Sequence, residues 1–186
     1  MLKISLLALS LLVFPVAYVV DIEQPQKVVE WQPDYSHLSP KAQKEVDCLA
    51  NNIYFESAYE PKSGQKAVAF VTLNRVKSEQ FPDSICEVVK QKTRNNAKTV
   101  CQFSWYCLAK PKSLFYRRHL EKTNNELYYE IRDLAIFVYA NYGRIYDPSL
   151  GSLYYHADYV RPKWRHSFVK MATIGKHIFY RSEEKI

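Results

Sequence analysis

A glutamate at the end of a short amphipathic segment is the residue best placed to do chemistry in this chain. Val46, Leu49 and Ile53 fall at helical spacing and predict a helix with one buried face. Pro61 biases the residue before it away from helical geometry, so Glu56 is expected in the last turn of that helix. A carboxyl group in this position faces the negative end of the helix dipole, which favours its protonated form.

Three aromatic neighbours strengthen the same effect. Tyr54, Phe55 and Tyr59 could shield the Glu56 carboxyl group from water, and loss of water also favours protonation. A carboxyl group that stays protonated near neutral pH is what a general acid requires. We therefore predict that Glu56 is a catalytic acid. The alternative is that it is a solvated acid at a helix end, as most surface glutamates are.

The elements expected to position this glutamate are mainly helical. A chain of 186 residues that is 47% hydrophobic is long enough for one domain with a sizeable core. Periodicity and capping signals predict helices over 41–59, 63–77, 85–89 and 124–142, and β-favouring runs predict strands over 152–156 and 177–180. The second helix is apolar nearly all round, so it should be the most buried, with Ser63 as its N-terminal cap.

The composition narrows the classes of function. Fifteen tyrosines, nine phenylalanines and three tryptophans suit a core and also a sugar-binding groove, while four glycines argue against a glycine-rich loop architecture. The formal net charge of +7 favours an anionic partner such as nucleic acid, acidic lipid or acidic wall polymer.

Two polar stretches interrupt the predicted helices and strands. Polar residues 91–96 predict a loop, and residues 110–118 form a basic run with interleaved aromatic residues.

The N-terminus predicts export. Lys3 precedes an apolar run over residues 4–20, which is the arrangement of an export segment. Residues 1–20 are interpreted as a cleaved signal peptide or a retained membrane anchor, and residues 21–44, which contain three prolines, as a linker to a domain over 45–183. The protein is then periplasmic or extracellular, and only its N-terminal segment is expected to contact the membrane.

Export makes disulfide bonds the expected state of the four cysteines. Cys101 and Cys107 bracket the segment 100–107, which has no regular period and is interpreted as a loop that displays aromatic side chains. We pair these two cysteines, which leaves Cys48 to bridge to Cys86. A zinc site is the competing interpretation, but no two cysteines have the Cys-x-x-Cys spacing.

Several short motifs follow one another in a recognisable order. They are the segments 48–56, 60–61 with 64–69, 73–76, 81–82, 86–89, 102–105, 155–156, 162–164 and 174–180. This order, over about residues 46–181, resembles the catalytic domain of the SleB-like cell wall hydrolases, the spore cortex-lytic type of peptidoglycan enzyme. The resemblance implies an α+β fold that is predominantly helical and lysozyme-like, with a small antiparallel sheet near the C-terminus. It also implies an exported enzyme that cleaves the glycan strand of peptidoglycan, and it places the family's acid on Glu56.

Two departures from the family pattern lie near the proposed site. The family usually has Ala-Arg-Gly after the glutamate, where this chain has Ser57, Ala58 and Tyr59, and it often has a histidine at the position of Tyr154. The first change alters the turn beside the acid and bears on substrate preference. The pair Glu56–Ser57 is itself similar to the Glu-Ser pair of other lytic transglycosylases.

The resemblance implies cleavage between N-acetylmuramic acid and N-acetylglucosamine. A lytic transglycosylase manages with one glutamate, because the C6 hydroxyl of the substrate attacks and forms a 1,6-anhydro product, so Glu56 would serve as acid and then as base. No cofactor or metal is needed. Glu60 is the nearby second acid, and it is either a substrate contact or a turn-capping residue beside Pro61.

Further residues are candidates to bind the sugar. Hydrogen bonds to acetamido or hydroxyl groups could come from polar side chains, and stacking from indole rings; the candidates are Gln102, Ser104, Tyr155, His156, Trp105 and Trp164. Each has a structural alternative: Trp105 as local core, Tyr155 as an inward-facing strand residue, and His156 as a polar contact in a sheet. His156 and His177 lie on the two predicted strands, which raises a metal or general-base interpretation without a metal-binding motif to support it.

Two rival functions are also consistent with this sequence. One is a non-catalytic peptidoglycan-binding or wall assembly protein that keeps the groove. The other is a basic nucleic-acid binder, against which the export segment argues. The expected partners are peptidoglycan glycan strands and anionic wall polymers, with no nucleic acid, and we expect a monomer.

Overall fold

The computed structural model describes residues 34–95, 98–108 and 125–182. The export segment over 1–20 and the basic run over 110–118 lie outside the described residues, and so does most of the predicted linker. Among the helices described, none combines the length and the apolar character that a membrane span requires. The division into leader, linker and catalytic domain therefore stays a prediction.

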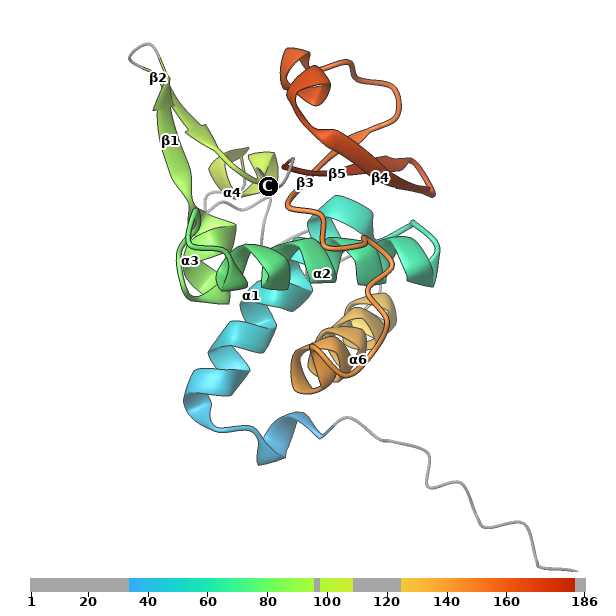
Figure 1. Cartoon of the computed structure of the whole chain (residues 1–186). Helices are drawn as coiled ribbons and strands as arrows, with labels where there is room; N and C mark the ends of the chain where they lie inside the picture. The colour runs from blue at the N-terminus through green and yellow to red at the C-terminus, as the bar shows by residue number, and fades with distance from the viewer. Residues whose placement is uncertain (1–33, 96–97, 109–124, 183–186) are drawn as a thin grey trace, which may run out of the picture. The chain divides into compact units, whose positions relative to one another are not determined.

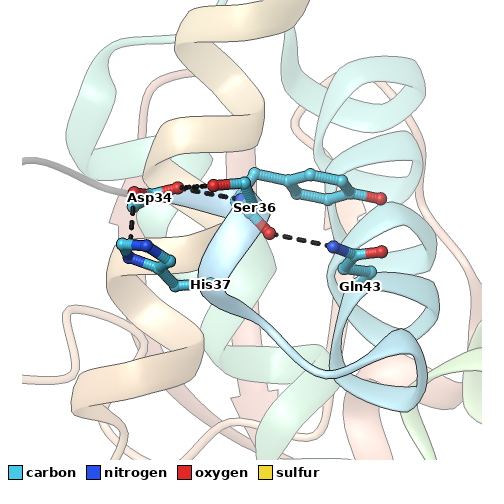
Figure 2. Close-up of polar contacts among 5 residues, drawn as sticks. Asp34, Ser36, His37 and Gln43 are labelled. Atoms are coloured by element: carbon cyan, nitrogen blue, oxygen red, sulfur yellow. Dashed lines mark hydrogen bonds and ion pairs between the residues drawn. The ribbon is translucent and has the colours of Figure 1, made fainter.

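Residues 34–44, which we assigned to the end of the linker, are structured. A 3-10 helix, η1 (Tyr35–His37), precedes the first α-helix, α1 (Pro40–Ser57), and Asp34 caps η1 by accepting hydrogen bonds from the backbone and hydroxyl of Ser36. Asp34 also pairs with His37 at 2.9 Å. The side chain of Gln43 in α1 donates to the carbonyl of Tyr35 at 3.1 Å, which fastens η1 to the first helix (Figure 2).

The helix that carries Glu56 forms as predicted. The first helix, α1 (Pro40–Ser57), begins with Pro40 in its first turn, and the hydroxyl of Ser39 accepts a hydrogen bond from the backbone of Ala42. Its periodic apolar residues are buried, and Glu56 lies in the last turn. The predicted position of Glu56 in the last turn is confirmed.

The second helix, α2 (Lys62–Lys77), is the central one. Ten of its residues are buried, and in Figure 1 it lies between the C-terminal sheet on one side and α1 with α6 (Asn125–Asn141) on the other. The predicted cap at Ser63 is wrong. Pro61 occupies the N-cap position without a side-chain hydrogen bond, so the helix begins at Lys62 and Ser63 lies within its first turn.

The third helix is short and is capped as the sequence suggested. This helix, α3 (Ile85–Lys90), starts after Ser84, whose hydroxyl accepts a hydrogen bond from the backbone of Glu87 at 3.3 Å. Its buried residues join those of α1, α2 and α6 in one hydrophobic core. The predicted predominance of helix is confirmed.

The C-terminal sheet contains the two predicted strands and one more. Strand β3 (Tyr154–Ala157) pairs antiparallel with β5 (His177–Arg181), which also pairs with β4 (Val169–Ile174). A second small core packs this sheet against α2 through Phe179, Ala67 and Val71, which are fully buried. Strand β4 was missed because it is half exposed and has no sustained apolar run.

The predicted loop over 91–96 is wrong. Strands β1 (Lys92–Asn95) and β2 (Lys98–Cys101) form an antiparallel hairpin, which projects away from the helices in Figure 1. Residues 92–94 and 99–100 are exposed, so the hairpin has no buried face to give it an apolar alternation. The predicted loop over 100–107 is also partly wrong, because β2 continues to Cys101 and a short helix, α4 (Ser104–Leu108), follows.

Both predicted disulfide bonds are confirmed. Cys48 pairs with Cys86 and joins α1 to α3, while Cys101 pairs with Cys107 and joins the end of β2 to α4. The first bond fastens the start of the segment 86–107 to α1, and the second closes a small loop at the end of that segment.

Candidate active site

Glu56 is half-buried at the junction of two cavities. The larger one, of about 440 Å³, is lined by the end of α1, the β2–α4 segment, β3, the turn after β3 and β5; its lining residues are Phe55, Glu56, Arg75, 101–105, 155–157, 159–160 and His177. The smaller one, of about 230 Å³, is lined by residues 54–60. A substrate in either cavity can therefore reach the same carboxyl group.

One hydrogen bond orients the Glu56 carboxyl group. The hydroxyl of Tyr155, on β3, donates to Oε2 of Glu56 at 3.1 Å. Tyr155 packs against Phe179 and the buried face of α2, so its ring is fixed by the second core. Tyr155 had two interpretations, an inward-facing strand residue and a residue of the site. The structure combines them, because the ring lies in the core and the hydroxyl reaches Glu56.

Burial raises the pKa of the Glu56 carboxyl group above its usual value. The hydrogen bond from Tyr155 and the positive charge of Arg75 act in the opposite direction, since both stabilise the carboxylate, but they do not cancel the effect of burial. This is the direction that a general acid requires.

Arg75 is a charged residue of the cavity that we did not select from the sequence. Arg75 is only 4% exposed, and its Nε donates to the carbonyl of Leu153 at 2.7 Å. Its guanidinium group also lies 5.1 Å from the ring centres of Phe81 and Phe103. Burial lowers the pKa of Arg75, but an arginine starts so far above neutral pH that it stays charged. Arg75 therefore places a fixed positive charge near Glu56.

A buried chain of hydrogen bonds fixes Trp105 at the cavity wall. The indole nitrogen of Trp105 donates to Oδ1 of Asn52 at 3.0 Å, and the amide of Asn52 donates to the hydroxyl of Thr72 at 3.1 Å. The Trp105 ring stacks on Phe55 with 4.6 Å between ring centres. Trp105 thus combines local packing with a place in the cavity. Asn52, which has no distinguishing feature in the sequence, holds it there.

The remaining sugar-binding candidates are divided between two places. Gln102 and Ser104 are exposed and line the larger cavity. His156 also contributes to its lining, but it is buried and its ring contacts Trp164 and Tyr180 on the opposite face of the sheet. Trp164 does not line this cavity; its ring packs on the opposite face of the sheet against Tyr154, His156, Phe168 and Tyr180. The structure therefore does not bring Trp164 to the Glu56 site.

The two histidines of the sheet do not converge. His156 lies opposite Ile178 and His177 lies opposite Ala157, so the alternation of the strands sends their side chains to opposite faces. Nε2 of His156 lies 3.0 Å from the hydroxyl of Tyr180, which is a polar contact within the sheet. In the part of the chain that the structure describes, no group of three His, Cys, Asp or Glu side chains could hold a metal ion.

Glu60 supports the turn between β4 and β5. Its Oε2 accepts a hydrogen bond from the backbone of Lys176 at 2.8 Å, which favours the turn-capping interpretation over a substrate contact, although Glu60 also lines the smaller cavity. The adjacent Gly175 has a φ of +55°, and a Cβ there would lie 1.9 Å from Oε2 of Glu60. A glycine is therefore required for the carboxylate to approach this turn.

Replacing Gly175 with alanine is expected to lower the free energy of unfolding by more than a glycine-to-alanine change at another position with positive φ. The positive φ alone costs an alanine about 1–2 kcal/mol. Displacement of Glu60 would add about 1–3 kcal/mol for the lost charge-assisted hydrogen bond. Urea unfolding measures the sum of these two losses in the free energy of unfolding. Gly151→Ala is the matched control, because Gly151 has a φ of +75° with no atom near its missing Cβ. Equal losses in the two variants would show that Glu60 contributes nothing to this turn.

Comparison with known proteins agrees with the resemblance described above. A family model described as Cell Wall Hydrolase matches residues 59–180, a span that begins after Glu56. The spore cortex-lytic enzyme of Bacillus cereus is 28% identical over 139 residues, covering 74% of this chain and 44% of the relative. The spore cortex-lytic enzyme of Bacillus subtilis is 26% identical over 136 residues, covering 73% of this chain and 37% of the relative. The chain thus spans less than half the length of these curated relatives.

Two solved structures share the fold. The catalytic domain of the Bacillus cereus SleB protein is 31% identical with a TM-score of 0.52, covering 75% of this chain and 91% of that chain. The catalytic domain of the germination-specific lytic transglycosylase SleB from Bacillus anthracis is 29% identical with a TM-score of 0.52, covering 78% of this chain and 98% of that one. The predicted fold class, predominantly helical α+β with a small C-terminal antiparallel sheet, is confirmed. With the family model matching most of the domain, this chain belongs to the Cell Wall Hydrolase family.

Proposed function

We propose that this protein degrades peptidoglycan by cleaving the glycan strand between N-acetylmuramic acid and N-acetylglucosamine, as a lytic transglycosylase with Glu56 as acid and base. The observation that carries the proposal is the half-buried Glu56 carboxyl group, which lines two cavities and whose pKa is raised by burial. The names of the relatives, a spore cortex-lytic enzyme and a lytic transglycosylase, support the same class of reaction.

The proposed reaction has two proton transfers through one group. Protonated Glu56 gives its proton to the glycosidic oxygen, and the bond from that oxygen to C1 of the muramic residue breaks through an oxocarbenium-like transition state. The C6 hydroxyl of the same residue then attacks C1 and gives its proton to the Glu56 carboxylate, which forms the 1,6-anhydro product and restores the acid. Tyr155 and Arg75 stabilise the carboxylate between the two steps.

The residues that line the two cavities are consistent with a mechanism that uses one catalytic carboxylate. Apart from Glu56, Glu60 is the acidic residue among the described lining residues of the two cavities, and its carboxylate accepts a hydrogen bond from the turn at Lys176. A glycosidase that uses two carboxylates needs both groups free beside the scissile bond. The engagement of Glu60 therefore favours the transglycosylase mechanism over that arrangement.

Mass spectrometry of digested peptidoglycan tests this function. We expect 1,6-anhydromuramic ends to accumulate when the purified protein is incubated with peptidoglycan sacculi. Reducing muramic ends instead would assign hydrolysis to the same site. Glycan strands that stay intact after long incubation would overturn the proposal and leave wall binding as the activity.

The place of action follows from the N-terminal sequence. We propose that the apolar segment over residues 4–20 exports the protein, and that the net charge of +7 helps it to stay on anionic wall polymers. Release of the protein from wall preparations by salt, without detergent, would support this electrostatic contact.

Replacing Tyr155 with phenylalanine is expected to move the alkaline limb of the pH–activity profile to higher pH. The hydroxyl of Tyr155 stabilises the Glu56 carboxylate, so its loss raises the pKa of Glu56 further, and the active protonated form persists to higher pH. Phenylalanine keeps the ring in the second core. Measurement of kcat/KM between pH 5 and 9 tests this, and an alkaline limb that stays in place or moves to lower pH would contradict it.

A further inference from the structure

Two exposed tyrosines lie in the two cavities that meet at Glu56. Tyr59 lines the smaller cavity and is 86% exposed, and Tyr159 lines the larger cavity and is 79% exposed. Exposed aromatic rings of this kind leave a flat apolar face in contact with water. A sugar ring presents a matching flat face of C–H groups, so stacking removes apolar surface from water on both sides.

The backbone that carries each tyrosine is held in place. Around Tyr59, the carbonyl of Ala58 accepts a hydrogen bond from the side chain of Gln65 at 2.8 Å, and the backbone of Glu60 donates to Ser57 at 3.0 Å. These bonds close the turn between α1 and α2. The ring of Tyr59 is therefore exposed on a segment whose backbone is fixed.

The turn that carries Tyr159 is braced in the same way. The backbone of Asp158 donates to the carbonyl of Lys176 at 2.8 Å, and the backbone of Val160 donates to Ala157 at 3.0 Å. The guanidinium group of Arg161 donates to the carbonyls of Asp158 and Val160 on either side of Tyr159. A ring on a fixed backbone loses less conformational freedom when it binds than a ring on a loose loop.

We propose that Tyr59 and Tyr159 are sugar-stacking residues, one in each cavity, which bind a glycan strand across the bond that Glu56 cleaves. The inference rests on the proposed function and specifies its substrate: a strand with sugar rings on both sides of the scissile bond. Stacking contributes to binding of the strand in the ground state as well as the transition state, so its loss raises KM more than it lowers kcat.

Single alanine variants test the two residues. For Tyr59→Ala and Tyr159→Ala we expect KM for soluble glycan strands to rise about threefold to tenfold, and the double variant to show roughly the product of the two. Both side chains are exposed, so folding should be unaffected. Tyr146→Ala is the matched control, because Tyr146 is 70% exposed and lines neither cavity. A KM within twofold of wild type in both single variants, or an equal rise in the control, would overturn the inference.

A binding measurement separates this inference from the proposed function. Cosedimentation with peptidoglycan sacculi reports retention of the protein whether or not the strand is cleaved. Weaker retention of both tyrosine variants, with unchanged retention of Tyr146→Ala, supports the stacking residues even if the wild-type protein cleaves nothing, in which case only the proposed function fails. Cleavage by the wild type together with unchanged retention and unchanged KM in the variants rejects the stacking residues alone.

Discussion

Replacing Glu56 with glutamine is expected to lower the rate of peptidoglycan cleavage by about 10²- to 10⁴-fold, the contribution typical of a positioned general acid. Glutamine has nearly the same shape, so it should keep the half-buried position at the end of α1 and can still accept the hydrogen bond from Tyr155. It has no acidic proton to give to the glycosidic oxygen. Release of soluble glycan fragments from sacculi, measured at equal protein concentration, gives the ratio of rates.

The controls for this variant separate chemistry from folding and binding. Glu130→Gln removes an exposed carboxylate on α6 that pairs with Lys62 at 3.0 Å, and it should cleave at the wild-type rate. Glu56→Gln should unfold at the same urea concentration as the wild type or a higher one, because burial already opposes its charge, and it should still sediment with sacculi. A Glu56→Gln variant that cleaves at the wild-type rate would show that this carboxyl group is not the acid.

The local part of the site was predictable because it depends on residues close together in the sequence. The spacing of Val46, Leu49 and Ile53 fixes the buried face of α1, and Pro61 limits how far the helix can extend. Together they determine that Glu56 stands in the last turn. The raised pKa of Glu56 was also predicted, and its main cause is burial, but Tyr59 does not provide the expected shielding because it is 86% exposed.

The groups that surround Glu56 could not be found in the same way. Tyr155 lies 99 residues further along the chain, and its hydroxyl reaches the carboxyl group only because β3 packs on α2. Arg75 reads from the sequence as a basic residue near a helix end, and its burial against Phe81 and Phe103 is a property of the assembled core. Long-range contacts of this kind leave no periodic signal in a single sequence.

The errors in secondary structure have a common cause. The β1–β2 hairpin is largely exposed and β4 is half exposed, so they lack the apolar alternation that identifies a strand. Trp164 shows the related problem for side chains. It packs against Tyr154 and His156, which strand alternation places on the face of the sheet opposite Tyr155, the residue that contacts Glu56. The motif 162–164 could be recognised in the sequence, but the face of the sheet on which Trp164 packs could not.

Removing the disulfide bond between Cys48 and Cys86 is expected to cause the largest loss of stability among these variants. The bond closes a loop of 38 residues, for which the chain-entropy model gives about 4 kcal/mol of stabilisation. Cys86 is buried in the main core, so alanine at both positions adds a small packing loss to the entropic one. Urea unfolding of the double alanine variant should show a much lower midpoint, since a domain has only about 5–15 kcal/mol in total.

The second disulfide bond provides the comparison that tests this explanation. Cys101 and Cys107 are only 6 residues apart, so the same model gives about 2 kcal/mol for this loop. Their bond also holds the segment that carries Trp105 at the larger cavity, to which Cys101 itself contributes. The double alanine variant of Cys101 and Cys107 should therefore lose less stability but a larger share of its cleavage rate at temperatures where both variants are folded. If the short loop proved the more stabilising of the two, restriction of the unfolded chain would not be the source of the effect, and native-state packing around α3 and α4 would have to explain it.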